Sequence, residues 1–145
     1  MPAMKPTPAI GQLREFSYRV PEEKTVAHVF EGERLFVDMP PVFATAYLVG
    51  LIEWVCMQVL EPHLEPGEQS VGTAINVTHT AATPVGLTVK VTVRVSGIQG
   101  RRVRFDVRAE DDAELVGEGT HERFVIVRER FLEGVAKKRE QFGKA

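Results

Sequence analysis

The sequence lacks several features on which common functions depend. Its 145 residues hold a single cysteine, Cys56, which excludes an intramolecular disulfide and any metal site built from several cysteines. The formal net charge is only −2, so no excess of positive charge favours nucleic acid or an acidic membrane surface. No ligand spacing for a metal, no Gly-x-Ser-x-Gly motif and no glycine loop opening a helix is present, which makes a dinucleotide site unfavourable. We therefore expect neither a metal nor a cofactor.

A secretion signal is also missing from the N-terminus. The opening stretch "MPAMKPTPAIGQ" is polar and rich in proline. With 43% hydrophobic residues, the chain is long enough for one compact domain with its own core. We expect a reduced, soluble, cytoplasmic protein with a flexible tail at residues 1–12, a folded domain at 13–128, and a C-terminal helix and tail at 129–145.

One apolar run dominates what is present. The stretch "VFATAYLVGLIEWVCMQVL", residues 42–60, contains a single charge, Glu53. Its length is close to the ~20 residues that span a bilayer. However, it also holds Thr45 and Gln58, and no second such run follows. A buried helix is the better interpretation, with Pro40-Pro41 ending the preceding segment and presetting the first helical turn.

Alternation of apolar and polar residues predicts strands on both sides of this run. The first strand covers residues 13–20, and four more follow from residue 70 to residue 127, with a terminal helix over 128–143. In the second strand we place Val71, Thr73, Ile75, Val77 and His79 on one face. We read the last four strands as a meander. One apolar helix covering a five-stranded antiparallel sheet is the α+β hot-dog layout, and the two-sided apolarity of the helix suggests that a second copy completes the core.

Glu53 and His79 are the first candidates for chemistry. A buried carboxylate must be paired, hydrogen-bonded or protonated. Glu53 is therefore either a residue at the water-accessible rim of a dimer or a catalytic carboxylate at the end of a pocket. His79 lies at a strand end between two threonines, and it is either a satisfied core histidine or a partner for Glu53.

Thr45 is the only hydroxyl in the first part of the helix, and it could simply bond its own backbone. Thr45 and Glu53 are eight residues apart, which on a regular helix is a rise of ~12 Å and a rotation of ~80°. Either Thr45 precedes the regular helix or the site uses two subunits. Cys56 has no basic neighbour in sequence, and we expect a buried, inert thiol.

Three stretches together resemble a known family. "VFATAYLVGLIEW", "EPGEQSVGTAINVTHTAATPVGLTV" and "GTHER" are similar to the fluoroacetyl-CoA thioesterases and their hot-dog relatives, from about Phe16 to Glu129. The resemblance implies a homodimeric hot-dog acyl-CoA thioesterase that needs no metal or cofactor. The family's catalytic residues fall on Thr45, Glu53 and His79.

The resemblance also implies residues that contact the substrate. The glycine near the thioester carbonyl falls on Gly72, and an arginine of the last strand falls on Arg123. Of two phenylalanines that close the acyl pocket, the first falls on Phe36, but the second falls on Met39. Because methionine is flexible and not aromatic, we expect a short-chain or otherwise small acyl-CoA as substrate rather than strict selection of a fluorinated acyl group.

Two other functions stay open from the residues alone. A hot-dog hydratase or dehydratase would bind acyl-CoA but use its carboxylate or histidine as a base on the acyl chain. A non-catalytic module would bind acyl-CoA without turning it over. The subunits are expected to form homodimers, which could pair further into tetramers.

Overall fold

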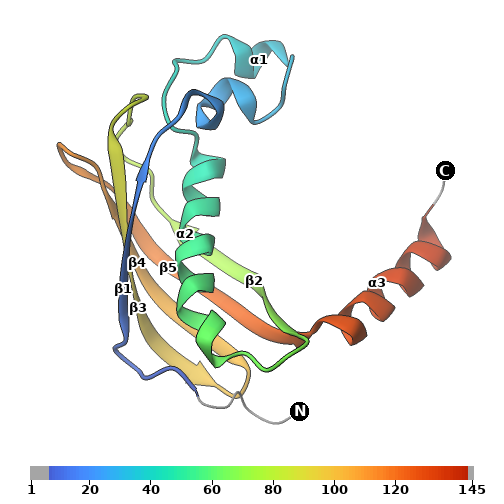
Figure 1. Ribbon diagram of the computed structural model, residues 1–145. Helices are drawn as coiled ribbons and strands as arrows, with labels where there is room; N and C mark the ends of the chain where they lie inside the picture. Colours follow the sequence, from blue (N-terminus) through green and yellow to red (C-terminus); the bar gives the residue numbers. More distant parts are fainter. Residues whose placement is uncertain (1–6, 144–145) are drawn as a thin grey trace.

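The computed structural model describes residues 7–143, which form one sheet with a long helix across it (Figure 1). The elements follow as β1 (Leu13–Arg19), α1 (Arg34–Val37), α2 (Thr45–Leu60), β2 (Glu68–Val77), β3 (Thr88–Gln99), β4 (Arg102–Glu110), β5 (Leu115–Val127) and α3 (Arg128–Phe142). Three short 3₁₀ turns join them: η1 (Glu22–Lys24), η2 (Val26–His28) and η3 (Glu61–His63). The five strands, the long helix and the terminal helix were all predicted from the sequence.

The strands form an antiparallel sheet in the order β1-β3-β4-β5-β2. The prediction of a four-stranded meander was wrong for β2, since only β3, β4 and β5 follow one another as neighbours. After β2 the chain crosses the end of the sheet, where Gly86 N–H donates to the Val20 carbonyl at 2.9 Å and sets β3 beside β1. Alternation within a strand reports which face is buried but not which strand lies next to it.

The core lies between α2 and the concave face of the sheet. From α2 it takes the side chains of Leu48, Ile52, Val55, Cys56 and Val59, and from the sheet those of Val89, Val91, Val93, Val95, Val103, Phe105 and Val107, all buried. The predicted inward positions of β3 and β4 are confirmed. Since α2 is apolar on more than one side, it also leaves Trp54 and Met57 exposed at 46% and 44%.

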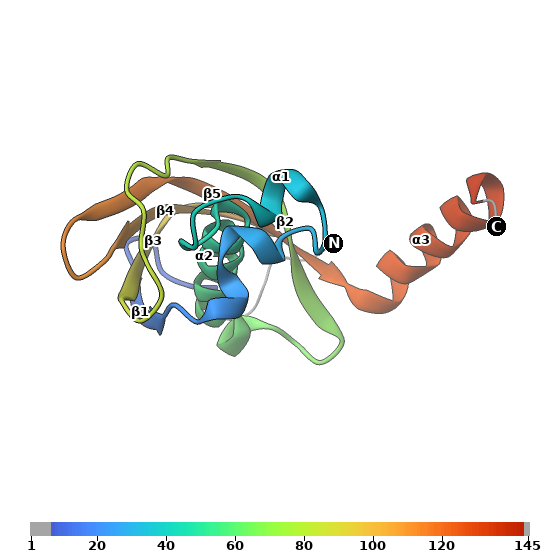
Figure 2. The ribbon, with the colours of Figure 1, turned by 90° about the horizontal axis from the view of Figure 1, so that it is seen from above.

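Helix α2 begins later than the prolines suggested. Pro40-Pro41 do not preset its first turn, because Val42 and Phe43 are extended and form isolated bridges to Pro84 and Thr25. Ala44 is the N-cap and Thr45 the first helical residue. Residues 21–44, which we call the cap, contain η1, η2 and α1 and lie over this end of α2 (Figure 2).

Strand β2 departs from simple alternation. A bulge lies between Gly72 and Ala74, so the expected single face from Val71 to His79 does not form. Ile75 is 42% exposed, and β2 ends at Val77, two residues before His79. A bulge adds one residue to one strand and turns the following side chains, and no pattern of apolar residues announces it.

The two ends of the described chain also differ from each other. Of the expected N-terminal tail, residues 1–6 lie outside the described residues. The part just before β1 is attached to β3, because Gly11 N–H donates to the Val95 carbonyl at 2.7 Å. Helix α3 extends away from the sheet with every described side chain exposed (Figures 1 and 2). Within residues 7–143, no helix is long and apolar enough to cross a membrane.

Candidate active site

Thr45 and His79 form a direct hydrogen-bonded pair. Thr45 is the first residue of α2, and its Oγ1 lies 2.7 Å from His79 Nδ1. The hydroxyl therefore bonds the imidazole, whereas a capping threonine would bond its own backbone. Partial burial lowers the pKa of His79 below its ordinary value of 6.5, although a backbone hydrogen bond at Ala81 acts in the opposite direction. At neutral pH the imidazole is thus uncharged and able to accept a proton.

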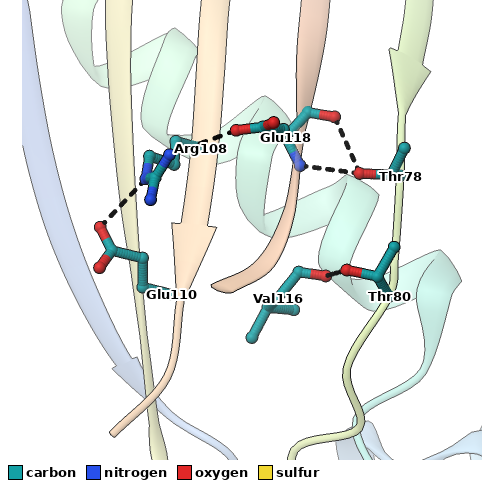
Figure 3. Close-up of polar contacts among 6 residues, drawn as sticks. All are labelled: Thr78, Thr80, Arg108, Glu110, Val116 and Glu118. Atoms are coloured by element: carbon teal, nitrogen blue, oxygen red, sulfur yellow. Dashed lines mark hydrogen bonds and ion pairs between the residues drawn. The ribbon is translucent and has the colours of Figure 1, made fainter. Parts of the chain in front are cut away.

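The segment carrying His79 is fastened to β5 on both sides of the histidine. Thr78 N–H and Oγ1 both donate to the Glu118 carbonyl, and Glu118 N–H donates back to Thr78 Oγ1 at 3.1 Å (Figure 3). Thr80 N–H donates to the Val116 carbonyl at 2.8 Å, and its hydroxyl reaches the same oxygen at 3.4 Å. These bonds hold the backbone on either side of His79 in place.

Gly117 makes this fastening possible. A Cβ on residue 117 would lie 2.0 Å from the carbonyl oxygen of Thr78, a distance that no side chain tolerates. Only glycine lets the two backbones approach so closely. Gly117 therefore allows the chain segment that carries His79 to lie directly against β5.

Glu53 takes part in a second cluster, farther along α2. Its Oε2 accepts a hydrogen bond from Arg123 Nη1 at 3.1 Å, and its side chain is 39% exposed whereas that of Arg123 is 4% exposed. Arg123 is held in turn by Ser70, through Nε to the hydroxyl at 2.8 Å and Nη2 to the carbonyl at 2.9 Å. The ion pair satisfies the carboxylate that the sequence had marked as needing a partner.

His121 completes this cluster, and sequence analysis did not single it out. Its Nδ1 lies 2.8 Å from the Ala74 carbonyl and its Nε2 lies 3.2 Å from Arg123 Nη1. A carbonyl only accepts and a guanidinium only donates, so the ring carries its proton on Nδ1 and is neutral. Burial, and more weakly the Arg123 charge, lower the pKa of His121. The position of His121 two residues before Arg123 on β5 was the only signal in the sequence.

Gly72 lies directly over the Glu53 carboxylate. A Cβ at residue 72 would be 2.8 Å from Glu53 Oε2 and 3.3 Å from His121 Cε1, so a larger residue would displace the carboxylate. A cavity of about 320 Å³ opens beside these groups, between α2 and β2. Val49, Thr73, Ala74 and Ile75 supply the rest of its lining. At the β2 bulge, four consecutive residues, 72–75, line this one cavity.

The two clusters do not meet within one chain. Thr45 belongs to the regular helix, so the idea that it precedes the helix is excluded, and eight helical residues separate it from Glu53 by a rise of ~12 Å. The described contacts pair Thr45 with His79 and Glu53 with Arg123, and the expected pairing of Glu53 with His79 does not occur within one copy. Cys56, one turn beyond Glu53, is fully buried as expected, and burial raises the pKa of its thiol.

The expected lid residues lie together in the cap. Phe36 belongs to α1 and is half-buried, and Met39 N–H donates to the Phe36 carbonyl at 3.2 Å. The Met39 side chain is 49% exposed. The aromatic neighbour of Phe36 is Phe30, with ring centroids 5.3 Å apart. An aromatic pair is therefore present in the cap, formed with a residue that precedes α1.

Comparisons with known proteins show which family this chain resembles. Residues 20–129 match the family described as fluoroacetyl-CoA-specific thioesterase. The fluoroacetyl-CoA thioesterase of Streptantibioticus cattleyicolor is 47% identical over 135 residues, which cover 93% of this chain and 97% of the relative.

Two solved structures extend the comparison to the fold. A mutant of a fluoroacetyl-CoA-specific thioesterase, in complex with fluoroacetate and CoA, superposes with a TM-score of 0.83 at 49% identity, over 85% of this chain and 98% of that one. A hot-dog-like protein from Thermanaerovibrio acidaminovorans superposes with a TM-score of 0.75 at 25% identity, over 94% of each chain. The predicted hot-dog fold is confirmed.

Proposed function

We propose, from the premise that this chain belongs to the fluoroacetyl-CoA-specific thioesterase family, that it hydrolyses a short-chain or otherwise small acyl-CoA to the free acid and CoA. The observation that carries the proposal is the 2.7 Å contact between Thr45 Oγ1 and His79 Nδ1. It joins a hydroxyl to a neutral imidazole at the start of a 16-residue helix. A related structure that contains fluoroacetate and CoA supports the choice of substrate class.

Two routes through this pair lead to the same products. In the first, His79 takes the Thr45 proton as the hydroxyl attacks the thioester carbonyl, CoA leaves as the thiol, and water then hydrolyses the acyl-threonine. In the second, His79 takes a proton from water as that water attacks the thioester carbonyl, the C–S bond breaks, and the proton passes to the CoA thiolate, while Thr45 donates a hydrogen bond to the carbonyl oxygen or orients the imidazole. In both routes the backbone N–H groups of Thr45 and Ala46 are suited to stabilise the oxyanion, because the first N–H groups of a helix have no carbonyl partner within it, whereas those of Tyr47 and Leu48 already donate to the Ala44 carbonyl.

Glu53 is proposed to act on the site of a second copy. Its side chain pairs with Arg123 and lines the cavity between α2 and β2. A homodimer that brings this cavity against the Thr45–His79 pair of another copy would place a carboxylate, an imidazole and a hydroxyl around one thioester. In that dimer Glu53 orients the attacking water or stabilises the protonated imidazole, and Gly72 and Arg123 border the substrate carbonyl.

Release of CoA from a panel of small acyl-CoA substrates tests the activity. We expect stoichiometric free acid and free thiol. Binding without thiol release would overturn the proposal in favour of a binding module, and hydration or dehydration of an enoyl or hydroxyacyl chain with the thioester intact would identify a different reaction.

Mixing two inactive variants tests the shared site. Thr45→Ala and Glu53→Gln homodimers are unfolded together and refolded, so that half of the dimers combine one chain of each kind. If each site draws Thr45 and Glu53 from different copies, every mixed dimer has one intact site, and the mixture regains about one quarter of parent activity. Two separately refolded variants are the control. A mixture that stays inactive, although mass spectrometry detects mixed dimers, would place each site within one copy.

A further inference from the structure

A second pocket lies on the opposite side of α2, between this helix and β1. It has a volume of about 280 Å³. Tyr18 of β1, Phe43, and Tyr47 and Trp54 of α2 supply four aromatic rings to its lining, and Lys24 of η1 supplies the one charged group. We call this the aromatic pocket. None of the candidate catalytic residues lines it.

The rings are arranged to hold another ring. Trp54 meets Tyr18 edge to face, with ring centroids 6.3 Å apart, and Tyr18 tilts against Phe43 at 6.2 Å. Phe16 packs edge to face on Trp54 at 4.7 Å and fixes its orientation. Edge-to-face and offset geometries are those by which aromatic side chains attract further rings. A cavity of about 150 Å³ admits benzene in an apolar protein interior, so this volume is sufficient for a substituted ring.

Gly50 keeps the floor of the pocket open. Glycine is among the least favourable residues in a helix interior. A Cβ at residue 50 would meet no atom within 4 Å, so no neighbouring group forces glycine here by crowding. The residue lines the pocket, so a large side chain at this position would compete for its space. Glycine at position 50 thus lowers the intrinsic stability of α2 and leaves the space of the pocket open.

Lys24 determines the charge of the occupant. Its Nζ lies 4.7 Å from the centre of the Tyr47 ring, the position that a cationic ligand takes in an aromatic cage. A second cation would be repelled, whereas an anion would pair with the ammonium. Tyr18 adds a neutral donor, because burial and the nearby Glu23 carboxylate raise the pKa of its hydroxyl.

We propose that the aromatic pocket binds a small planar aromatic carboxylate, with its ring among Tyr18, Tyr47 and Trp54 and its carboxylate at the Lys24 ammonium. This site is separate from the proposed thioesterase centre. Its occupancy does not depend on that activity, so each proposal can fail without the other.

Trp54 is the only tryptophan of the chain, so its fluorescence reports the pocket directly. The probes are benzoate and phenylacetate. We expect saturable changes in emission with a dissociation constant on the order of 1 mM or tighter. Cyclohexanecarboxylate, with the same charge but no aromatic ring, and benzyltrimethylammonium, with the ring but the opposite charge, should bind several-fold more weakly. Tighter binding of the cation than of benzoate would overturn the proposal.

Variants locate the binding. Gly50→Leu fills the pocket with a residue that favours helix and should abolish binding, whereas Gly50→Ala should weaken it only slightly. Lys24→Met should weaken benzoate about two- to five-fold, the usual effect of one exposed ion pair. Ligand-detected NMR measures these affinities without relying on Trp54, and circular dichroism confirms that the variants are folded. Unchanged benzoate binding to a folded Gly50→Leu variant would place the ligand elsewhere.

Two further measurements test whether the pocket is instead occupied by the nucleotide end of CoA or covered by another copy of the chain. Adenosine 3′,5′-bisphosphate, which resembles the nucleotide end of CoA, should not displace benzoate. If it does, the pocket belongs to the substrate and the proposal of an independent site falls. Trp54 emission should also not depend on protein concentration. A blue shift on concentrating the protein, lost in Gly50→Leu, would mean that another copy covers this face and would likewise overturn the proposal.

Discussion

The two sides of α2 carry different chemistry on one continuous helix. Toward β2, Thr45, Val49 and Glu53 recur every four residues, and the two polar ones are bonded to His79, just beyond β2, and to Arg123 of β5. Toward β1, Tyr47, Gly50 and Trp54 line the aromatic pocket, whose only charged lining residue is Lys24, outside the helix. The β2 side holds its polar groups in hydrogen bonds, whereas the β1 side presents a pocket lined mainly by aromatic rings. The spacing of residues along one apolar helix thus separates two surfaces of different chemistry.

The largest expected effect comes from removing the base on the β2 side. His79→Ala should lower kcat by about 10²–10⁴-fold, the usual range for loss of a general acid or base. His28→Ala, a histidine of the cap that bonds Glu31, is the matched control and should leave turnover close to that of the parent. Steady-state kinetics on one good acyl-CoA measures both variants. Parent-like turnover in His79→Ala would remove the histidine from the site.

Glu53→Gln should have the next largest effect. The amide keeps the shape of the side chain but removes the charge beside Arg123, and we expect a loss of about 10²-fold in turnover. Glu61→Gln, at the exposed end of the same helix, is the control. Both variants should elute as the parent does on gel filtration. Equal rates for Glu53→Gln and Glu61→Gln would mean that the carboxylate has only a structural role.

Met39→Phe tests which acyl groups the enzyme accepts, and its effect on turnover should be smaller than the effects of the two preceding variants. One methylene in an apolar pocket changes binding by about 1–3 kcal/mol, so neighbouring chain lengths should differ modestly in the parent. The phenylalanine should narrow the range toward the smallest acyl groups. The measurement is kcat/KM for fluoroacetyl-, acetyl-, propionyl- and butyryl-CoA. A parent that already prefers fluoroacetyl strongly over acetyl would show that Met39 does not widen the pocket.

The smallest expected effect is on stability against pH. Burial lowers the pKa values of His79 and His121, so on acidification the unfolded chain takes up these protons first. The free energy of unfolding should therefore begin to fall as the pH drops through about 6.5, the pKa of histidine in the unfolded chain. The fall should stop once the pH is below the lowered pKa values of the two histidines in the folded protein. His121→Gln should flatten the dependence of Tm on pH between about pH 7 and pH 5. An unchanged slope would mean that His121 does not couple folding to protonation.

The sequence predicted the two sides of α2 unequally. Glu53 stood out because a lone charge in an apolar run needs a partner, but nothing local identified that partner as Arg123, seventy residues away. His79 was found through its neighbouring threonines and through the family resemblance. His121 was missed because a histidine in an alternating strand looks like any other residue of that strand. Its importance comes from a strand register that places it beside Ala74 and Arg123.

The aromatic pocket was not predicted at all. Its rings come from β1, from Phe43 two residues before α2, and from two turns of the helix, and the sequence pattern placed them only in a strand and in an apolar run. Pairing order is what brings them together, since β1 lies at the edge next to β3 and not beside β2. Local patterns specified the elements well because burial of one face governs each of them. Sites that depend on the order of strands or on a bulge require the assembled sheet.

The single thiol of the chain has a practical use that follows from its burial. Cys56 is fully enclosed by the core, and burial keeps it protonated. A thiol-specific dye added to the folded protein should therefore stay unreacted, and it should couple only when α2 separates from the sheet. The rate of labelling then measures how often the core opens. Any molecule that holds α2 in place, on either side of the helix, should slow that rate and could be discovered by this means without knowledge of its target site.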